Sequence, residues 1–253
     1  MTPAYFNKVR PTYLENWSAA LANLSIEQTD IPLSLTEARA LGLANKKFKG
    51  WFGGEDGRVT PALAQIAEKI EDSLRKYPAG AFVRLGSRSA KDSTYAYIHG
   101  ARIEDAAAAV KTLTSDSQRI AFDLRLALKH DYRPHIFVRR WMDIPAWAEF
   151  RCFMRDRKLV GISQYDCKNL GRCLEIAEHA NQLRTAIESF SEKISAASHL
   201  DDVVFDVFVE IKERRQPSVK VTLLELNPFF PQTDACLFSW RDNGDFDGSF
   251  RFV

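Results

Sequence analysis

Two apolar segments near the end of the chain carry oxygen-bearing side chains that an ordinary buried strand would exclude. Asp206 interrupts VVFDVFVEI, and Glu225 and Asn227 interrupt VKVTLLELN. If the two segments form a hairpin whose loop spans 212–218, Asp206 comes opposite Glu225 to within about one residue, with β carbons ~4.5–5.5 Å apart. Asn227 then lies about 6.7 Å beyond Glu225 on the same face.

Two carboxylates at that separation repel each other unless a cation neutralises both. Oxygen ligands without histidine or cysteine are typical of Mg²⁺ or Ca²⁺ rather than zinc. The pattern therefore favours a hard metal ion held by Asp206, Glu225 and Asn227, and neutralising either carboxylate should then stabilise the metal-free protein. An ion pair of one carboxylate with an arginine, or a proton shared between the two acids, would also account for the pattern.

A second hairpin is predicted over AEFRCFMRDRKLVGISQ, with its turn in RDRK. Counting outward from that turn sets Glu149 opposite Gln164 and Arg151 opposite Ile162. Because side chains on a strand alternate between faces, Glu149, Arg151 and Gln164 would share one polar face. Such a face either lines a binding site or simply meets solvent.

A cationic loop, LGSRSAKDS at 85–93, lies between two segments predicted as strands, 81–85 and 94–98. Together with Arg84 it offers arginine and lysine side chains, three hydroxyls and one glycine. These groups can bind phosphate through charge-assisted hydrogen bonds and backbone amides. The spacing matches neither a P-loop nor a Rossmann fingerprint, and basic loops are often only solvated.

The elements around these residues predict an α+β protein of two lobes. Helices are expected across the first 80 residues and near 103–113 and 116–131, the last opened by a capping box of Ser115 and Gln118. Strands dominate from His135 onward, apart from one long helix near 170–195. We expect an N-terminal lobe over 1–134 and a C-terminal lobe over 135–253.

Bulk composition excludes several classes of protein. Of 253 residues, 45% are hydrophobic and 27% charged, and the formal net charge is +2, far below what non-specific nucleic-acid binding requires. No apolar run approaches the ~20 residues that span a bilayer, and the N-terminus lacks the apolar core of a signal peptide. The four cysteines form no C-x-x-C pair, so a zinc site is not expected. We expect a cytoplasmic protein with no membrane and no nucleic-acid partner.

Four segments, in this order, resemble the cell division cycle protein 123 family. They are FVRLGSRSAKDS, FVRRWMDIPAWAEFRCFMRDRKLVGISQYD, VVFDVFVE and LLELNPFFPQTDACLFSW. The resemblance covers roughly residues 80 to 240 and is poor before residue 80. It implies an ATP-grasp-like fold, with antiparallel sheets and flanking helices in two lobes that close on a nucleotide cleft. It also implies ATP and Mg²⁺ as ligands, and eukaryotic members act as assembly chaperones for translation initiation factor 2.

The resemblance also assigns roles residue by residue. Its nucleotide-contacting positions correspond here to Arg84, Gly86, Ser87, Arg88, Arg139, Arg140, Trp141, Glu149, Arg151 and Gln164. Its magnesium ligands correspond to Asp206, Glu225 and Asn227, the residues that the hairpin count selects. The chain departs from the family pattern in three ways, since Arg84 replaces a lysine, Glu225 replaces an aspartate and Tyr165 replaces an arginine.

Two functions are compatible with these features. The resemblance implies a nucleotide-dependent assembly chaperone or binding factor for a protein partner of the initiation factor 2 type. The alternative is an ATP-dependent ligase that activates a carboxylate as an acyl phosphate for attack by an amine or another nucleophile. Phosphoryl transfer needs positioning, cations and magnesium rather than a protein nucleophile, so the residues suit either function.

Overall fold

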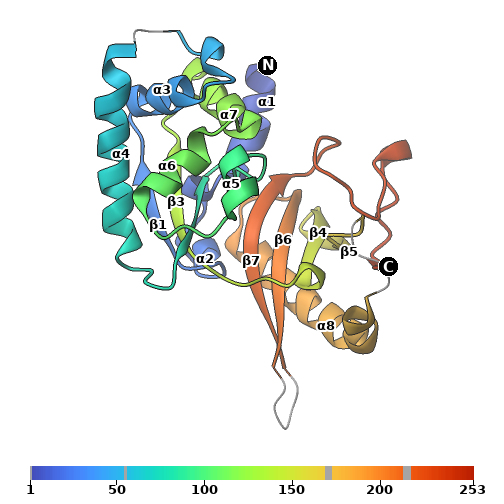
Figure 1. Cartoon of the computed structure of the whole chain (residues 1–253). Helices are drawn as coiled ribbons and strands as arrows, with labels where there is room; N and C mark the ends of the chain where they lie inside the picture. Colours follow the sequence, from blue (N-terminus) through green and yellow to red (C-terminus); the bar gives the residue numbers. More distant parts are fainter. Residues whose placement is uncertain (1, 54–55, 169–172, 213–217) are drawn as a thin grey trace. The chain divides into compact units, whose positions relative to one another are not determined.

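The computed structural model describes residues 2–53, 56–168, 173–212 and 218–253 (Figure 1). The loop expected between the two last long strands falls mainly at 213–217, outside the described residues. The expected start of the long helix at 170–172 also lies outside them.

The chain divides into two compact units. The first comprises Met1–Glu15 and Glu27–Met142, and the second comprises Asn16–Ile26 and Asp143–Val253. The division after Met142 differs from the one expected between residues 134 and 135. A short N-terminal segment also belongs to the second unit, which the sequence did not indicate.

The first unit contains a three-stranded antiparallel sheet with the order β1-β3-β2. Its strands are β1 (Gln28–Pro32), β2 (Ala81–Leu85) and β3 (His135–Arg140). β3 is the central strand because it pairs with both neighbours. The sequence assigned this segment to the second lobe, but its hydrogen-bond partners place it in the first unit.

The first unit also contains the helices α1 (Pro3–Val9), α3 (Leu35–Ala44), α4 (Val59–Leu74), α5 (Thr94–His99), α6 (Ala106–Thr114) and α7 (Gln118–Lys129), with 3₁₀ turns η1 (Arg10–Thr12), η3 (Lys49–Trp51) and η4 (Asp56–Arg58) (Figure 1). α3, α4, α6 and α7 share a hydrophobic core with the three strands. α4 shows why they are helical: Ile66 and Ile70, one turn apart, are both fully buried, as the apolar stripe of an amphipathic helix requires. α3 begins with a capping box, in which Ser34 Oγ accepts from the Glu37 amide at 3.2 Å and Glu37 Oε2 accepts from the Ser34 amide at 2.8 Å.

α5 corrects the prediction of a strand at 94–98. Ser93 Oγ accepts a hydrogen bond from the Ala96 amide at the start of the helix, and Gly100 follows its end with φ 84°. An N-cap serine and a glycine with positive φ are helix boundary signals, and they outweigh the alternation of aromatic and small residues that suggested a strand.

α7 corrects the prediction of its N-cap. Ser117 rather than Ser115 caps the helix, because Ser117 Oγ accepts from the Ile120 amide at 3.1 Å. The Ser115 carbonyl instead accepts from the amide of Thr94, the first residue of α5. The two candidate serines are two residues apart, so only the backbone geometry decides between them.

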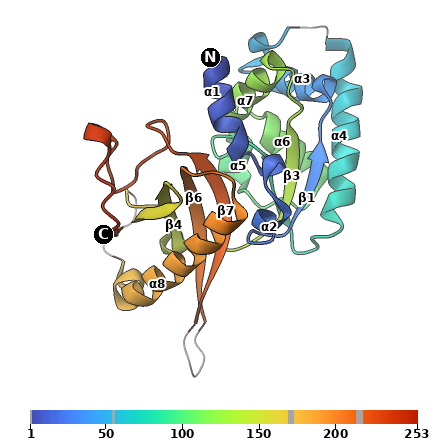
Figure 2. The ribbon, with the colours of Figure 1, turned by 180° about the vertical axis from the view of Figure 1, so that it is seen from behind.

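The second unit contains a five-stranded sheet with the order β7-β6-β4-β5-β8. The strands of this sheet are β4 (Glu149–Arg155), β5 (Lys158–Gln164), β6 (Val203–Lys212), β7 (Ser218–Pro228) and β8 (Phe250–Arg251). The second unit also contains the helices α2 (Ala19–Ala22) and α8 (Leu174–Ala197) and the 3₁₀ turns η5 (Ala146–Ala148) and η6 (Arg241–Asn243). The 3₁₀ turn η2 (Leu14–Asn16) spans the junction with the first unit. α8 packs against the sheet through contacts with β5 and β7 (Figure 2). All neighbouring pairs are antiparallel except β5 and β8, which are parallel.

A small aromatic core covers part of one face of this sheet. Phe153 of β4 lies opposite Val204 of β6, and both are fully buried. Phe238 and Phe246 from the segment after β7 pack on Phe153, with ring centroids 5.3 and 4.7 Å away. The segment between β7 and β8 is therefore part of the folded unit, and it packs on the face that carries the candidate site.

Candidate functional site

The register of β6 and β7 brings the two predicted carboxylates together. Asp206 lies opposite Glu225, which confirms the hairpin prediction. The register shifts between Asp206 and Val207, so that Val207 pairs with Leu223 and Leu224 is the additional residue of β7. Without this bulge Asp206 would oppose Leu224, and Glu225 would point to the other face of the sheet.

Asn227 completes the group of three oxygen-bearing side chains. Its Nδ2 lies 3.3 Å from Oδ2 of Asp206 and 3.4 Å from Oε1 of Glu225. Rotation of the amide by half a turn would present its oxygen instead, so the donor set fits a hard cation such as Mg²⁺. Across the described ranges, no three His, Cys, Asp or Glu side chains gather as a metal site would require. A magnesium site here would use two carboxylates and one amide.

Arg151 of β4 holds Asp206 with both arms of its guanidinium. Nε donates to Oδ1 and Nη2 to Oδ2, each at 2.8 Å. The Arg151 side chain is 6% exposed and that of Asp206 is 0% exposed. This is the carboxylate–arginine ion pair that the sequence left open as an alternative. It also shows that the face is buried at this point rather than merely solvated.

The ion pair changes the protonation of both groups. Burial raises the pKa of the Asp206 carboxyl and the adjacent Glu225 raises it further, while the guanidinium of Arg151 opposes the shift. Burial works against the charge of Arg151, but the Asp206 carboxylate raises the pKa of the guanidinium well above its usual range. Arg151 therefore keeps its positive charge, and Asp206 is already partly compensated before any metal ion binds.

The remaining donor of Arg151 fixes a segment that the sequence analysis did not single out. Nη1 donates to the Asp234 carbonyl at 2.9 Å, and the guanidinium lies 4.8 Å from the ring centroid of Tyr165. Asp234 also pairs with Lys168 at 2.8 Å. All three guanidinium nitrogens are thus used within the second unit, so in this structure Arg151 positions Asp206 rather than facing a ligand. The TD pair within LLELNPFFPQTDACLFSW was the available signal for Asp234.

The register of β4 and β5 corrects the second hairpin. Gln164 lies opposite Phe150, and Arg151 lies opposite Ser163, because the register shifts between Phe153 and Met154. Gln164 is therefore on the face opposite to that of Arg151. It is fully buried, and its Oε1 accepts from the Val253 amide at 3.0 Å.

Glu149 does share the face of Arg151, as predicted. Glu149 lies opposite Phe208 of β6, two residues along from the pair of Arg151 with Asp206. Ser163, rather than the expected Ile162, lies opposite Arg151, and its Oγ accepts from the Leu237 amide at 3.1 Å. The polar face thus carries Glu149, Arg151 and Ser163.

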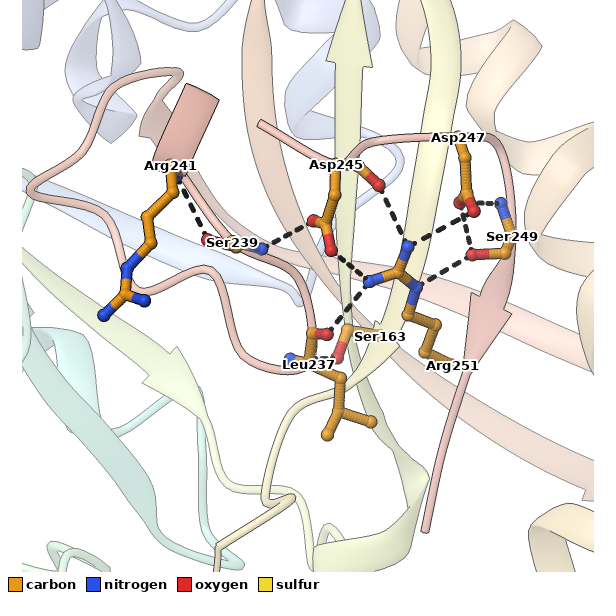
Figure 3. A network of polar contacts seen from close by, with 8 residues as sticks. All are labelled: Ser163, Leu237, Ser239, Arg241, Asp245, Asp247, Ser249 and Arg251. Carbon is orange, nitrogen blue, oxygen red and sulfur yellow. Dashed lines mark hydrogen bonds and ion pairs between the residues drawn. The ribbon is translucent and has the colours of Figure 1, made fainter. Parts of the chain in front are cut away.

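Arg251 of β8 organises the segment that follows Asp234 (Figure 3). Its Nη1 donates to the Leu237 carbonyl at 3.1 Å and to Asp245 Oδ2 at 2.8 Å, and its Nη2 donates to the Asp245 carbonyl at 2.9 Å. Asp247 pairs with it at 3.3 Å, and its guanidinium lies 3.9 Å from the ring centroid of Phe238. One side chain therefore joins the two ends of the segment.

In the first unit, the residues predicted to meet phosphate are largely enclosed. Arg84 is 4% exposed, and its Nε donates to the Leu85 carbonyl at 3.0 Å. Arg88 Nε pairs with the buried Asp123 at 2.9 Å, which raises the pKa of the guanidinium although burial works against its charge. Burial raises the pKa of the Asp123 carboxyl, while Arg88 and Ser87 beside it oppose the shift. Asp123 thus anchors the loop, and the sequence analysis did not identify it.

Gly86 packs against the carboxylate of Glu15. An ideal β carbon there would be 1.6 Å from Oε2 of Glu15, whose Oε1 accepts from the Tyr132 hydroxyl at 2.9 Å. Burial raises the pKa of the Glu15 carboxyl. A side chain at position 86 would displace the Glu15 carboxylate from its hydrogen bond with Tyr132, so glycine here suits the packing of the first unit, whatever ligand the loop binds.

The three residues predicted beside adenine lie at the end of β3. Arg139 is 3% exposed and pairs in register with Gln28 and Phe82. Arg140 is exposed, and the Trp141 amide donates to the Gly80 carbonyl at 3.1 Å. They form the last part of the first unit before the chain enters the second.

The Asp30–His135 pair beside Gly86 provides a pH-dependent test of the first unit. Nδ1 of His135 lies 2.7 Å from Asp30 Oδ1, and this hydrogen bond raises the pKa of His135 from 6.5. A raised histidine pKa stabilises the folded state fully below the unfolded pKa, and the stabilisation is lost as pH rises through the folded pKa. We expect Asp30→Asn to lower the Tm more at about pH 5.5 than at about pH 8.5.

Thermal unfolding across that pH range measures the difference. Asp72→Asn is the control, since Asp72 pairs with the exposed Arg75 at 3.3 Å and no histidine takes part in that ion pair. A loss of Tm for Asp30→Asn that is the same at both pH values would show that the pair does not stabilise the protonated ring.

Comparison with known proteins identifies the family. The D123 family model matches residues 45–245. The chain is 27% identical over 212 residues to a translation initiation factor eIF2 assembly protein of Sclerotinia sclerotiorum, covering 78% of this chain and 50% of that protein. It is 27% identical over 186 residues to the protein of the same name in Dictyostelium discoideum, covering 70% of this chain and 46% of the relative. The chain thus spans about half the length of these two relatives.

A solved structure shows the same fold. Cdc123 from Schizosaccharomyces pombe superposes with a TM-score of 0.73 at 22% sequence identity, covering 92% of this chain and 90% of that one. The predicted α+β class and the predicted family fold are confirmed. Within the described part of the chain, no helix combines the length and apolarity needed to cross a membrane. The family model matches most of the chain, and the chain therefore belongs to the D123 family.

Proposed function

We propose that this protein binds ATP together with Mg²⁺ and acts as a nucleotide-dependent assembly factor for a protein partner. The observation that carries the ligand proposal is the cluster of Asp206, Glu225 and Asn227. Two facing carboxylates and an amide gather around one point, and ordinary hairpins rarely bury acids face to face.

In this proposal the three residues of the cluster bind the metal ion, and Arg151 orients one of them. Asp206, Glu225 and Asn227 would hold the ion, and Arg151 keeps Asp206 in one orientation through its two hydrogen bonds. A bound Mg²⁺ would neutralise phosphate charge and orient the nucleotide. The nucleotide contacts that the resemblance assigns, from Arg84 to Gln164, remain predictions. Among them, Gln164 is the least suited, because it faces away from Arg151.

The assembly role rests on the family. The relatives in Sclerotinia and Dictyostelium are named eIF2 assembly proteins. We propose that this chain likewise assists the assembly of a translation factor of that type. Release of ADP or phosphate on incubation with a carboxylate and an amine would favour the ligase alternative instead.

Thermal unfolding with and without ligand tests the nucleotide proposal. A ligand that binds only the folded protein stabilises it by about 2.7 kcal/mol at a hundredfold excess over Kd. We expect ATP with Mg²⁺ to raise the Tm clearly more than Mg²⁺ alone or ATP with EDTA. Glu225→Gln should lose most of the magnesium-dependent part of this shift, because one of the two charges on the ion is removed.

Glu210→Gln is the matched control. Glu210 lies on β6 near the far end of the same hairpin, where it pairs with Lys220 at 3.5 Å. The control should keep the full shift with ATP and Mg²⁺. If millimolar ATP with Mg²⁺ leaves the Tm of the unmodified protein unchanged, the nucleotide proposal is wrong.

A further inference from the structure

The segment that follows α3 carries a cluster of exposed cations. Lys46, Lys47 and Lys49 are all exposed, and so is Arg125 of α7. Within the ranges that the structure describes, none of these four forms an ion pair with an acidic side chain. Residues 39–58 contain five basic and two acidic residues, a formal net charge of +3, whereas the whole chain carries +2. This stretch therefore has a local excess of positive charge.

Two aromatic side chains give this surface a fixed base. The rings of Phe48 and Trp51 lie 4.8 Å apart, and both pack against the core of the first unit. The ammonium of Lys47 lies 5.5 Å from the Phe48 ring, and the guanidinium of Arg125 lies 5.6 Å from the Trp51 ring. These contacts bring the guanidinium of Arg125 close to the ammonium of Lys47, and they restrict the motion of both side chains.

A cavity of about 390 Å³ adjoins the same segment. Its wall combines aliphatic side chains with two cations, and the lining includes Leu35, Arg39, Leu43, Arg58 and Val59. The Arg39 guanidinium donates to the Gly53 carbonyl, so the segment that leaves the end of α3 returns to the middle of that helix. The cavity lining reaches Leu43 of α3, three residues before Lys46 in the chain.

We propose that this surface, defined by Arg39, Lys46, Lys47, Lys49, Arg58 and Arg125, binds an acidic segment of a partner protein. Carboxylates of the partner would meet the cations, and an aliphatic or aromatic side chain between them would enter the cavity. Lysines just beyond a helix end also interact favourably with the helix dipole, but this does not account for the aromatic base or the cavity. The surface belongs to the first unit and shares no residue with the carboxylate cluster of the second, so binding should not require nucleotide.

A protein partner fits better than a nucleic acid. The aliphatic side chains of Leu35, Leu43 and Val59 offer no hydrogen bonds to a base or a sugar, but they match an apolar side chain. Non-specific nucleic-acid binding also needs a denser positive field than a chain with a net charge of +2 provides.

The test uses a synthetic peptide that alternates Glu with Leu, measured by fluorescence anisotropy against the whole protein. We expect the triple variant Lys46→Glu, Lys47→Glu, Lys49→Glu to bind this peptide at least about tenfold more weakly, because three attractive contacts become repulsive. A peptide with Gln in place of Glu should bind weakly to both proteins. Binding of the Glu peptide to the unmodified protein should weaken as salt is raised.

The matched control is Lys76→Glu, Lys158→Glu, Lys193→Glu, which changes the net charge equally at three exposed lysines elsewhere. An equal loss of affinity in the control would overturn the proposal, since only total charge would then matter. Failure of the unmodified protein to bind the Glu peptide more tightly than the Gln peptide would also overturn it. An oligouridine RNA that binds more tightly than the peptide, with only the first triple variant impaired, would assign the surface to RNA instead. Addition of ATP and Mg²⁺ separates this result from the nucleotide proposal, because the peptide affinity should not change.

Discussion

Replacing Asp206 by asparagine is expected to lower the free energy of unfolding by about 3–5 kcal/mol in the absence of ligand. The substitution removes the charge that compensates Arg151, whose side chain is 6% exposed, and it leaves a single oxygen where two accepted hydrogen bonds at 2.8 Å. Urea denaturation measures the loss directly. The sequence alone predicts the opposite sign, because two facing carboxylates without a cation repel each other.

Glu225→Gln provides the contrast. Glu225 is the neighbour that raises the pKa of Asp206, so removal of its charge relieves a repulsion. We expect a change of less than about 1 kcal/mol in the free energy of unfolding. If Glu225→Gln were severely destabilising and Asp206→Asn neutral, then Arg151 would depend on Glu225, and the ion pair described above would be wrong.

Replacing Phe153 by alanine is expected to lower the free energy of unfolding by about 3–5 kcal/mol, as usual for a large aromatic side chain removed from a core. Phe153 is fully buried, and it contacts the rings of Phe238, Trp240 and Phe246 at 5.3, 6.2 and 4.7 Å. Its loss should free the segment between β7 and β8. Urea denaturation reports the stability, and hydrogen exchange of the Leu237 amide reports the segment.

The Leu237 amide is informative because it donates to Ser163 Oγ, beside Arg151. It should exchange faster in Phe153→Ala even under conditions where the protein stays folded. Phe153→Leu, which refills most of the volume, should lose less stability and keep the Leu237 amide protected. Equal protection in both variants would mean that Phe153 stabilises the sheet alone and does not hold the segment.

The sequence by itself determined the class of the fold, the family and most of the elements. Alternation of apolar residues was sufficient for β4, β6 and β7, and the RDRK turn correctly paired Arg155 with Lys158. It was not sufficient for 94–98, where a capping serine and a terminal glycine make a helix of a segment that alternates like a strand. The sequence analysis also placed His135–Arg140 in the wrong unit, because the residues of a strand do not reveal which other strands it pairs with.

The tertiary structure alone decided which side chains of the candidate site meet. A bulge at Leu224 turns Glu225 to the face of Asp206, and a bulge after Phe153 turns Gln164 away from the face of Arg151. Side chains on a strand alternate with a period of two, so one additional residue moves every later side chain to the other face. The sequence names the residues that could bind a metal ion, but a count along two strands does not reveal the bulges. The packing of the whole sheet fixes the bulges, and the bulges determine which residues share a face.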